Sequence, residues 1–180
     1  MPLLPPVRTA SKRFREKGLE GVGIADLMQE VGLTVGGFYK HFDSRDDLVV
    51  EALRSAFGTW RRQSAAVASG RPPLTYAKLV DDYLSEAHRD HPGSGCAISA
   101  LAGEIARSSK RTRALLTEEI RNAFQLIADL TPGKDERSAA ILTLSVLVGA
   151  IGLSRAVSDE PLSREILKTV SELLKKKVCE

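Results

Sequence analysis

Residues 24 to 45 constrain the fold of this chain most strongly, because they predict two helices joined by a short glycine turn. The first helix carries one apolar face with i, i+3, i+4, i+7 spacing, formed by Ile24, Leu27, Met28 and Val31. Gly32 suits the left-handed residue that ends a helix, and Thr34 can cap the next helix. Leu33 is expected to fill the junction between the helices. The turn, Gly32 to Thr34, has the length found in a helix-turn-helix.

The second helix is expected to bury Val35, Phe38 and Phe42, which leaves its other face almost without bulk. Gly36 and Gly37 each cost a helix roughly 1 kcal/mol relative to alanine, so a purely structural helix rarely carries both. Close approach to the wall of a DNA groove is one reason for two glycines. Tight packing of Gly37 against a neighbouring helix is the alternative.

The residues that follow offer polar groups suited to nucleic acid. Tyr39 and Lys40 supply a hydroxyl and a cation for phosphate oxygens, and His41 supplies ring donors for a base edge or a phosphate.

The run Gly37-Phe38-Tyr39-Lys40-His41-Phe42-Asp43-Ser44-Arg45, with Phe14-Arg15-Glu16-Lys17-Gly18-Leu19 before it, resembles the DNA-binding domain of TetR-family transcriptional regulators. The resemblance implies double-stranded DNA as partner, contacts from Thr34, Tyr39, Lys40 and His41, and a phosphate contact from Arg45. The predicted DNA-binding residues are Thr34, Val35, Gly36, Gly37, Tyr39, Lys40, His41 and Arg45.

Two departures from the family pattern stand out. Val22 and Gly23 occupy the place where family members carry a hydroxyl residue that caps the second helix. Pro5 and Pro6 are expected to delay the first helix until about Val7. That helix should turn Val7, Ala10 and Phe14 inward.

The composition is that of a folded protein, with 43% hydrophobic and 27% charged residues among 180. The net charge of +3 agrees with a polyanionic partner. A local basic run is opposed only by Glu16 and comprises Arg8, Lys12, Arg13, Arg15 and Lys17; a solvated basic face is the alternative to a DNA contact.

Nothing in the sequence indicates export, so the cytoplasm is expected.

The rest of the chain predicts helices without a competing strand pattern, at Thr75 to Arg89, Cys96 to Arg107, Lys110 to Leu130, Asp135 to Val157 and Leu162 to Lys177. The predicted fold class is therefore all-α, with about nine helices. A three-helix helix-turn-helix domain is expected over residues 1–66, and an antiparallel helical ligand-binding and dimerisation domain over 67–180, because Ser69 to Pro73 breaks the chain.

The segment Ser138 to Ser154 contains no charged residue. Its 17 uncharged residues fall short of the roughly 20 that span a bilayer, and Arg155 follows, so no membrane partner is expected. We expect one side in the domain core and the other against a second subunit. The predicted interface of this homodimer comprises Leu144, Val148, Ile151, Ile166, Val170 and Leu173.

A small-molecule effector is expected in the C-terminal domain by the same resemblance. Large residues on inward helix faces are candidates for its pocket, with ordinary core packing as the alternative: Trp60, Tyr83, Cys96, Leu101, Glu104, Phe124 and Leu147. Cys96, at a predicted helix start, fits either a reactive thiol or a packed side chain. His88, Asp90 and His91 more simply end a helix than bind a metal; no metal or cofactor is expected.

Taken together, these patterns and the resemblance predict a homodimeric, ligand-responsive transcriptional repressor that binds a near-palindromic operator. No catalytic set can be assembled, so an enzyme is not expected. The competing interpretation is an all-α ligand carrier or enzyme whose N-terminal helices only resemble a DNA reader. The sequence does not distinguish repression from activation, nor does it identify the effector or the operator.

Overall fold

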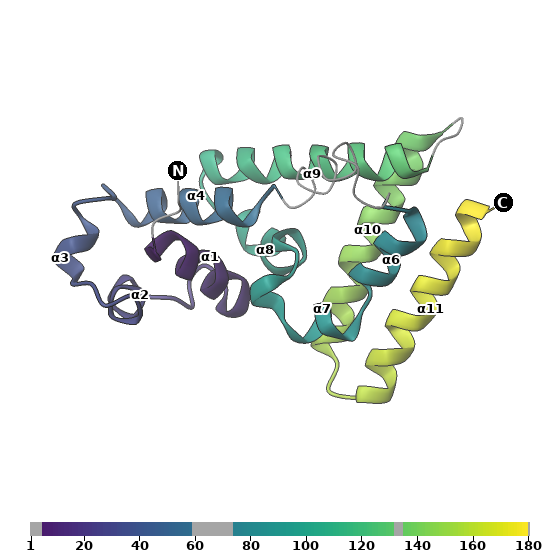
Figure 1. The fold of residues 1–180 in the computed structure, drawn as a ribbon, viewed down its shortest axis with the longest axis horizontal. Helices are drawn as coiled ribbons and strands as arrows, with labels where there is room; N and C mark the ends of the chain where they lie inside the picture. Colours follow the sequence, from purple (N-terminus) through teal and green to yellow (C-terminus); the bar gives the residue numbers. More distant parts are fainter. Residues whose placement is uncertain (1–4, 59–73, 132–134, 180) are drawn as a thin grey trace. The chain divides into compact units, whose positions relative to one another are not determined.

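The computed structural model describes residues 5–58, 74–131 and 135–179, and all regular elements in these ranges are helices (Figure 1). This confirms the all-α fold class. The chain divides into unit 1, residues 1–58 and 92–118, and unit 2, residues 59–91 and 119–180. The domain boundary predicted near residue 66 lies outside the described residues. Residues 92–118, by their contacts, join the N-terminal helices.

Unit 1 contains seven elements or parts of elements: α1 (Pro5–Lys17), α2 (Ile24–Glu30), α3 (Val35–Phe38), α4 (Arg45–Ala56), the short 3-10 helix η1 (Pro92–Ser94), α8 (Ala97–Ile105) and the first part of α9 (Lys110–Leu130). The expected start of the first helix near Val7 was wrong, because α1 begins at Pro5. Proline lacks an N–H, but the first turn of a helix has no partner for that group.

The core of unit 1 is built around α1, which packs against α4, α2, α8 and η1. Val7, Ala10 and Phe14 are buried, as predicted. The apolar stripe of α4 also lies in this core, through Leu48 and Leu53. Phe38 is the one residue of α3 that joins the same core, and it holds α3 against the other helices.

Unit 2 contains α6 (Tyr76–Tyr83), α7 (Glu86–Asp90), the second part of α9, α10 (Glu136–Ala156) and α11 (Glu160–Cys179). The single helix predicted from Thr75 to Arg89 is divided, because Ser85 is extended and its side chain accepts a hydrogen bond from the backbone N–H of His88. In this unit α10 packs along α11, α6 also packs on α11, and α7 packs on α10.

A polar network ties α7 to the junction of α10 and α11. The Arg89 guanidinium donates to Ser163 Oγ at 2.9 Å and to the Glu160 carboxylate at 3.0 Å. The Arg155 guanidinium donates to the backbone carbonyls of Arg89 at 2.9 Å and His88 at 2.6 Å. Burial and the positive charge of Arg155 lower the pKa of His88 below its ordinary value of 6.5. His88 is therefore held in its neutral form at neutral pH.

Helix α10 is long and apolar enough to cross a membrane, with 21 residues and a mean hydropathy of 1.8. One side, however, is buried within unit 2 and includes two polar residues: Ala140, Thr143, Leu144, Leu147, Ala150, Ile151 and Ser154. Thr143 shares a hydrogen bond of 3.1 Å with the Tyr76 hydroxyl. One side of α10 therefore lies in the core of unit 2.

Candidate nucleic-acid interface

The turn between α2 and α3 has the predicted caps. Gly32 adopts a φ of +71°, the left-handed conformation expected after a helix. The Thr34 hydroxyl accepts a hydrogen bond from the backbone N–H of Gly37 at 3.2 Å. Leu33, however, does not fill the helix junction, since it is 41% exposed; the backbone N–H of Leu33 instead bonds the Met28 carbonyl at 2.8 Å. That bond closes the turn and leaves the Leu33 side chain in solvent.

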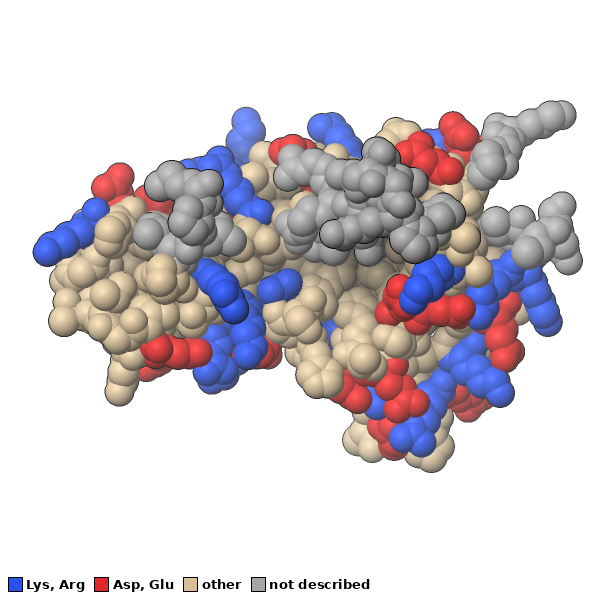
Figure 2. All heavy atoms as spheres, in the orientation of Figure 1, with Lys and Arg blue, Asp and Glu red and all other residues tan. Residues whose placement is uncertain are grey.

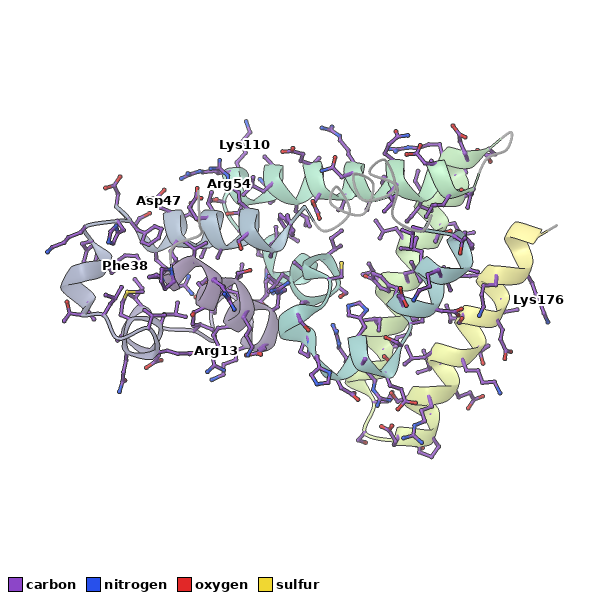
Figure 3. The ribbon with its side chains drawn as sticks, viewed as in Figure 1. Arg13, Phe38, Asp47, Arg54, Lys110 and Lys176 are labelled. Carbon is purple, nitrogen blue, oxygen red and sulfur yellow. The ribbon has the colours of Figure 1, made fainter. Side chains whose placement is uncertain are left out.

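Helix α3 is a single turn anchored by aromatic side chains. Phe38, which points from α3 into unit 1 in Figure 3, and Phe42 are buried, with ring centroids 5.2 Å apart. The predicted burial of Val35 was wrong, because this side chain is 45% exposed. A one-turn helix held by its last residue does not bring its first residue into the core.

The segment from Thr34 to His41 is a continuous exposed surface except for Phe38 and the half-buried Gly37. It contains every predicted DNA-binding residue apart from Arg45. Tyr39 is 61% exposed, and Lys40 and His41 are exposed beside it. The molecular surface over α2 and α3 is mostly uncharged in the view of Figure 2.

Nothing within the described chain requires glycine at positions 36 and 37. Neither residue has a positive φ. A Cβ atom at Gly36 or Gly37 would meet only the Thr34 hydroxyl, at the ordinary contact distances of 3.9 and 3.6 Å. Gly18 differs, because its φ is +80° and a Cβ there would lie 2.6 Å from the Glu104 carboxylate. The packing explanation for Gly37 is therefore wrong for the described residues, and close approach to a DNA groove stays a prediction.

Arg45 is engaged inside unit 1. Its guanidinium donates to the carbonyls of Leu19 and Val22, and it lies 3.6 Å from the Glu20 carboxylate. It also lies 6.0 Å from the centroid of the Phe14 ring. These bonds tie the start of α4 to the α1–α2 connection. A phosphate contact by Arg45 stays a prediction. It would have to use N–H groups of the guanidinium that do not donate to Leu19 or Val22.

Part of the basic run on α1 is also used within the protein. Arg13 pairs with Glu30 at 2.8 Å and with Glu16 at 3.2 Å. Arg15 donates to the carbonyls of Ser11 and Gly95. The exposed members of the run are Arg8, Lys12 and Lys17.

Two polar contacts of unit 1 were not foreseen in the sequence. The Glu104 carboxylate on α8, predicted to line a ligand pocket, instead accepts the backbone N–H of Leu19 at 2.7 Å. The Arg111 guanidinium on α9 donates to Asp47 on α4 at 2.6 Å. Arg111 and the Ser44 hydroxyl lower the pKa of the Asp47 carboxyl. Both contacts join residues more than sixty positions apart, so no local pattern signals them.

The described residues of the predicted pocket are divided between the two units. Cys96, Leu101 and Glu104 belong to unit 1; Tyr83, Phe124 and Leu147 belong to unit 2. Leu101 and Leu147 are core residues. The Phe124 ring lies 4.7 Å from the Arg137 guanidinium. Trp60 lies outside the described residues. The ligand pocket stays a prediction.

The residues of the predicted subunit interface differ in how exposed they are. Leu144 and Ile151 are buried in the core of unit 2, so a partner could not reach them without opening that core. Val148, Ile166 and Val170 are half-buried, whereas Leu173 is 60% exposed. The exposed apolar face of α10, called the α10 face below, carries Ile141, Leu142 and Leu153 beside the exposed small residues Ser145, Gly149 and Gly152.

Comparison with known proteins finds a family model and relatives that resemble this chain. The model of the tetR family of bacterial regulatory proteins matches residues 7–52. The chain is 26% identical over 120 residues to the HTH-type transcriptional repressor KstR2 of Rhodococcus jostii. The aligned region covers 64% of this chain and 56% of KstR2. It is 29% identical over 164 residues to an HTH-type transcriptional regulator of Mycobacterium tuberculosis, covering 85% of this chain and 84% of the relative.

Solved structures share the fold over nearly the whole chain. The reduced form of NemR from Escherichia coli superposes with a TM-score of 0.76 at 19% identity, covering 95% of this chain and 93% of that one. A TetR transcriptional regulator from Chloroflexus aurantiacus gives 0.75 at 22% identity, covering 94% and 92%. The helix-turn-helix region of this chain, residues 7–52, is therefore that of the tetR family of bacterial regulatory proteins, and the whole chain shares its fold with solved TetR regulators.

Proposed function

We propose that this DNA-binding transcriptional regulator acts as a homodimeric repressor that inserts α3 into the major groove of a near-palindromic operator. The observation that carries the proposal is the exposed surface from Thr34 to His41, with two glycines that the fold of the chain does not require. Repression is favoured over activation because the relative KstR2 is a transcriptional repressor.

The dimer is supported by the α10 face. Ile141, Leu142 and Leu153 expose large apolar side chains on a helix whose other side is already in a core. Burial of such a face against a second copy removes it from water. Two α3 helices could then enter half-sites roughly 34 to 36 Å apart, as a palindromic operator requires.

A small apolar or amphipathic effector is proposed to regulate DNA binding from the C-terminal domain, residues 67–180. An effector weakens operator affinity only if it binds more tightly to a conformation that holds the two α3 helices at the wrong separation. Coupling of about 1 to 3 kcal/mol corresponds to roughly a 5- to 150-fold loss of affinity.

The test is duplex binding by the full chain, measured against salt concentration for genomic fragments that the purified protein retains. Tyr39→Ala and Lys40→Ala should each weaken binding about 10-fold, since each removes a phosphate-directed group. Lys40→Ala should also lower the slope of log affinity against log salt by about one per subunit.

Lys176→Ala provides the matched control. It removes the same charge from an exposed lysine of α11, in unit 2 (Figure 3), and should leave DNA affinity unchanged. Binding without salt dependence, or equal affinities for all four proteins, would remove α3 from the DNA contact and favour a ligand carrier or enzyme.

A further inference from the structure

The first turn of α3 presents an apolar surface rather than a polar one. In the described part of unit 1, the large hydrophobic residues that are exposed are Leu33, Val35 and Tyr39, all within one segment of seven residues. Single exposed apolar side chains are ordinary on a protein surface, but a group of three confined to one short segment marks a contact surface.

This turn also lacks the side chains that read bases by paired hydrogen bonds. From Leu33 to Phe38 the sequence holds no Arg, Lys, Asn, Gln, Asp or Glu. The Thr34 hydroxyl oxygen already accepts the N–H of Gly37. Bidentate recognition of guanine by Arg or of adenine by Asn or Gln is therefore impossible at the first turn of α3.

Within this turn the Thr34 side chain alone can hydrogen-bond, so apolar contact is the means of base discrimination left to Val35. The major-groove edge of a base pair carries one apolar group, the 5-methyl of thymine. Val35, which carries two methyl groups, is 45% exposed, and Gly36 and Gly37 place no side chain between it and an approaching base. We infer that Val35 contacts the 5-methyl group of a thymine, so that each operator half-site contains a T·A pair read through this methyl.

The inference rests on the proposed function, because it requires α3 to lie in the major groove. Val35, rather than Leu33, is assigned the contact because it is the first residue of α3 and lies next to both glycines. Leu33 belongs to the turn and precedes the Thr34 cap. The two side chains are similarly exposed, at 45% and 41%, so exposure alone does not separate them.

The experiment starts from duplexes that the full chain selects out of a random library. Each thymine of the selected duplex is replaced in turn by deoxyuridine, which removes only the 5-methyl group. At one thymine per half-site the replacement should lower affinity about fourfold, the value of one buried methyl group. Val35→Ala should bring the affinities for the thymine and uracil duplexes closer together, because it removes both γ-methyl groups of the side chain.

Two variants distinguish this contact from a general loss of binding. Lys40→Ala should weaken both duplexes and preserve their fourfold ratio. Leu33→Ala should also preserve the ratio; if it removes the ratio while Val35→Ala keeps it, the assignment to Val35 is wrong. Circular dichroism should show the parent fold in all three variants.

The remaining outcomes separate this inference from the function on which it rests. Selection of a defined sequence in which no thymine shows a methyl effect overturns the inference and leaves the DNA-binding function intact. A chain that retains no sequence from the library, at any salt concentration, overturns both.

Discussion

Gly36 and Gly37 stand out at the residue scale because the free protein does not benefit from them. An alanine at either position would meet only the Thr34 hydroxyl, at 3.9 or 3.6 Å. Glycine inside a helix is less stable than alanine by roughly 0.5 to 1 kcal/mol. The two residues therefore make α3 less stable than alanine would, and they leave its outer surface without side chains.

Because glycine makes α3 less stable, replacing Gly36 by alanine should have opposite effects on folding stability and on DNA binding. Gly36→Ala should raise the free energy of unfolding by up to about 1 kcal/mol, yet weaken operator binding, because the added methyl group lies on the DNA-facing surface. Denaturant titration measures the first quantity and gel-shift titration the second. Gly18→Ala is the contrasting case: its φ of +80° and the nearby Glu104 carboxylate should make this variant less stable. A Gly36→Ala protein that keeps full affinity would remove the reason given for the glycine.

The helix caps of this region could be predicted from neighbouring residues. The burial of the side chains in α3 and its turn depends on tertiary contacts. Gly32 and Thr34 act as predicted because each cap involves residues no more than a few positions away. The orientation of Val35 and Leu33 depends on how short α3 is and on which residue anchors it. Residue spacing alone could not show that Phe38 would be the single anchor.

At the element scale, α8 supports the helix-turn-helix through one carboxylate. Glu104 accepts the N–H of Leu19, which is itself buried just after α1. Glu104→Ala should leave this N–H without its acceptor and lower the free energy of unfolding by about 1 to 3 kcal/mol. Glu104→Gln keeps an acceptor oxygen and should lose less. Chemical denaturation of both variants tests the contact; equal stability of Glu104→Ala and the parent would contradict it.

The break between α6 and α7 places His88 where its protonation opposes folding. Its folded-state pKa lies below the ordinary 6.5 because of burial and the charge of Arg155. Protonation therefore favours the unfolded chain, so the stability associated with neutral His88 is complete above about pH 6.5 and declines as pH falls below it. Thermal unfolding measured from pH 7.5 to 5.5 should show a falling midpoint in the parent and a flatter profile in His88→Gln. Parallel profiles would exclude this role.

The helix positions show what periodicity can and cannot establish. Lys110 to Leu130 was predicted to the residue, since a long amphipathic helix repeats its signal many times. The division at Ser85 was not predicted, because a single capping residue inside an otherwise regular apolar pattern is a weak signal.

At the scale of the whole molecule, exposed large apolar residues of the described chain gather in two places: the α3 turn, and helices α10 and α11. The first is the proposed DNA surface and the second the proposed subunit interface. Elsewhere on α11 the exposed surface is charged, with acidic and basic side chains interspersed (Figure 2).

The dimer prediction follows from this distribution. Leu142→Glu or Leu153→Glu places a charge on the α10 face and should give a folded monomer, because each side chain is exposed in the single chain. Ile151→Arg should instead unfold unit 2, because Ile151 is fully buried and a charge there would be unpaired. Sedimentation and circular dichroism distinguish the two results. A parent that is monomeric at micromolar concentration would contradict both the interface and the two-site operator mechanism.

The discontinuity of unit 1 has a consequence for synthesis. Its N-terminal helices pack with η1 and α8, and its contacts extend to residue 118. A ribosome must therefore translate the first part of unit 2 before the DNA-reading unit can be completed. Folding of whole units one after another from the N-terminus is therefore interrupted here, because residues 59–91 of unit 2 are made before unit 1 is complete.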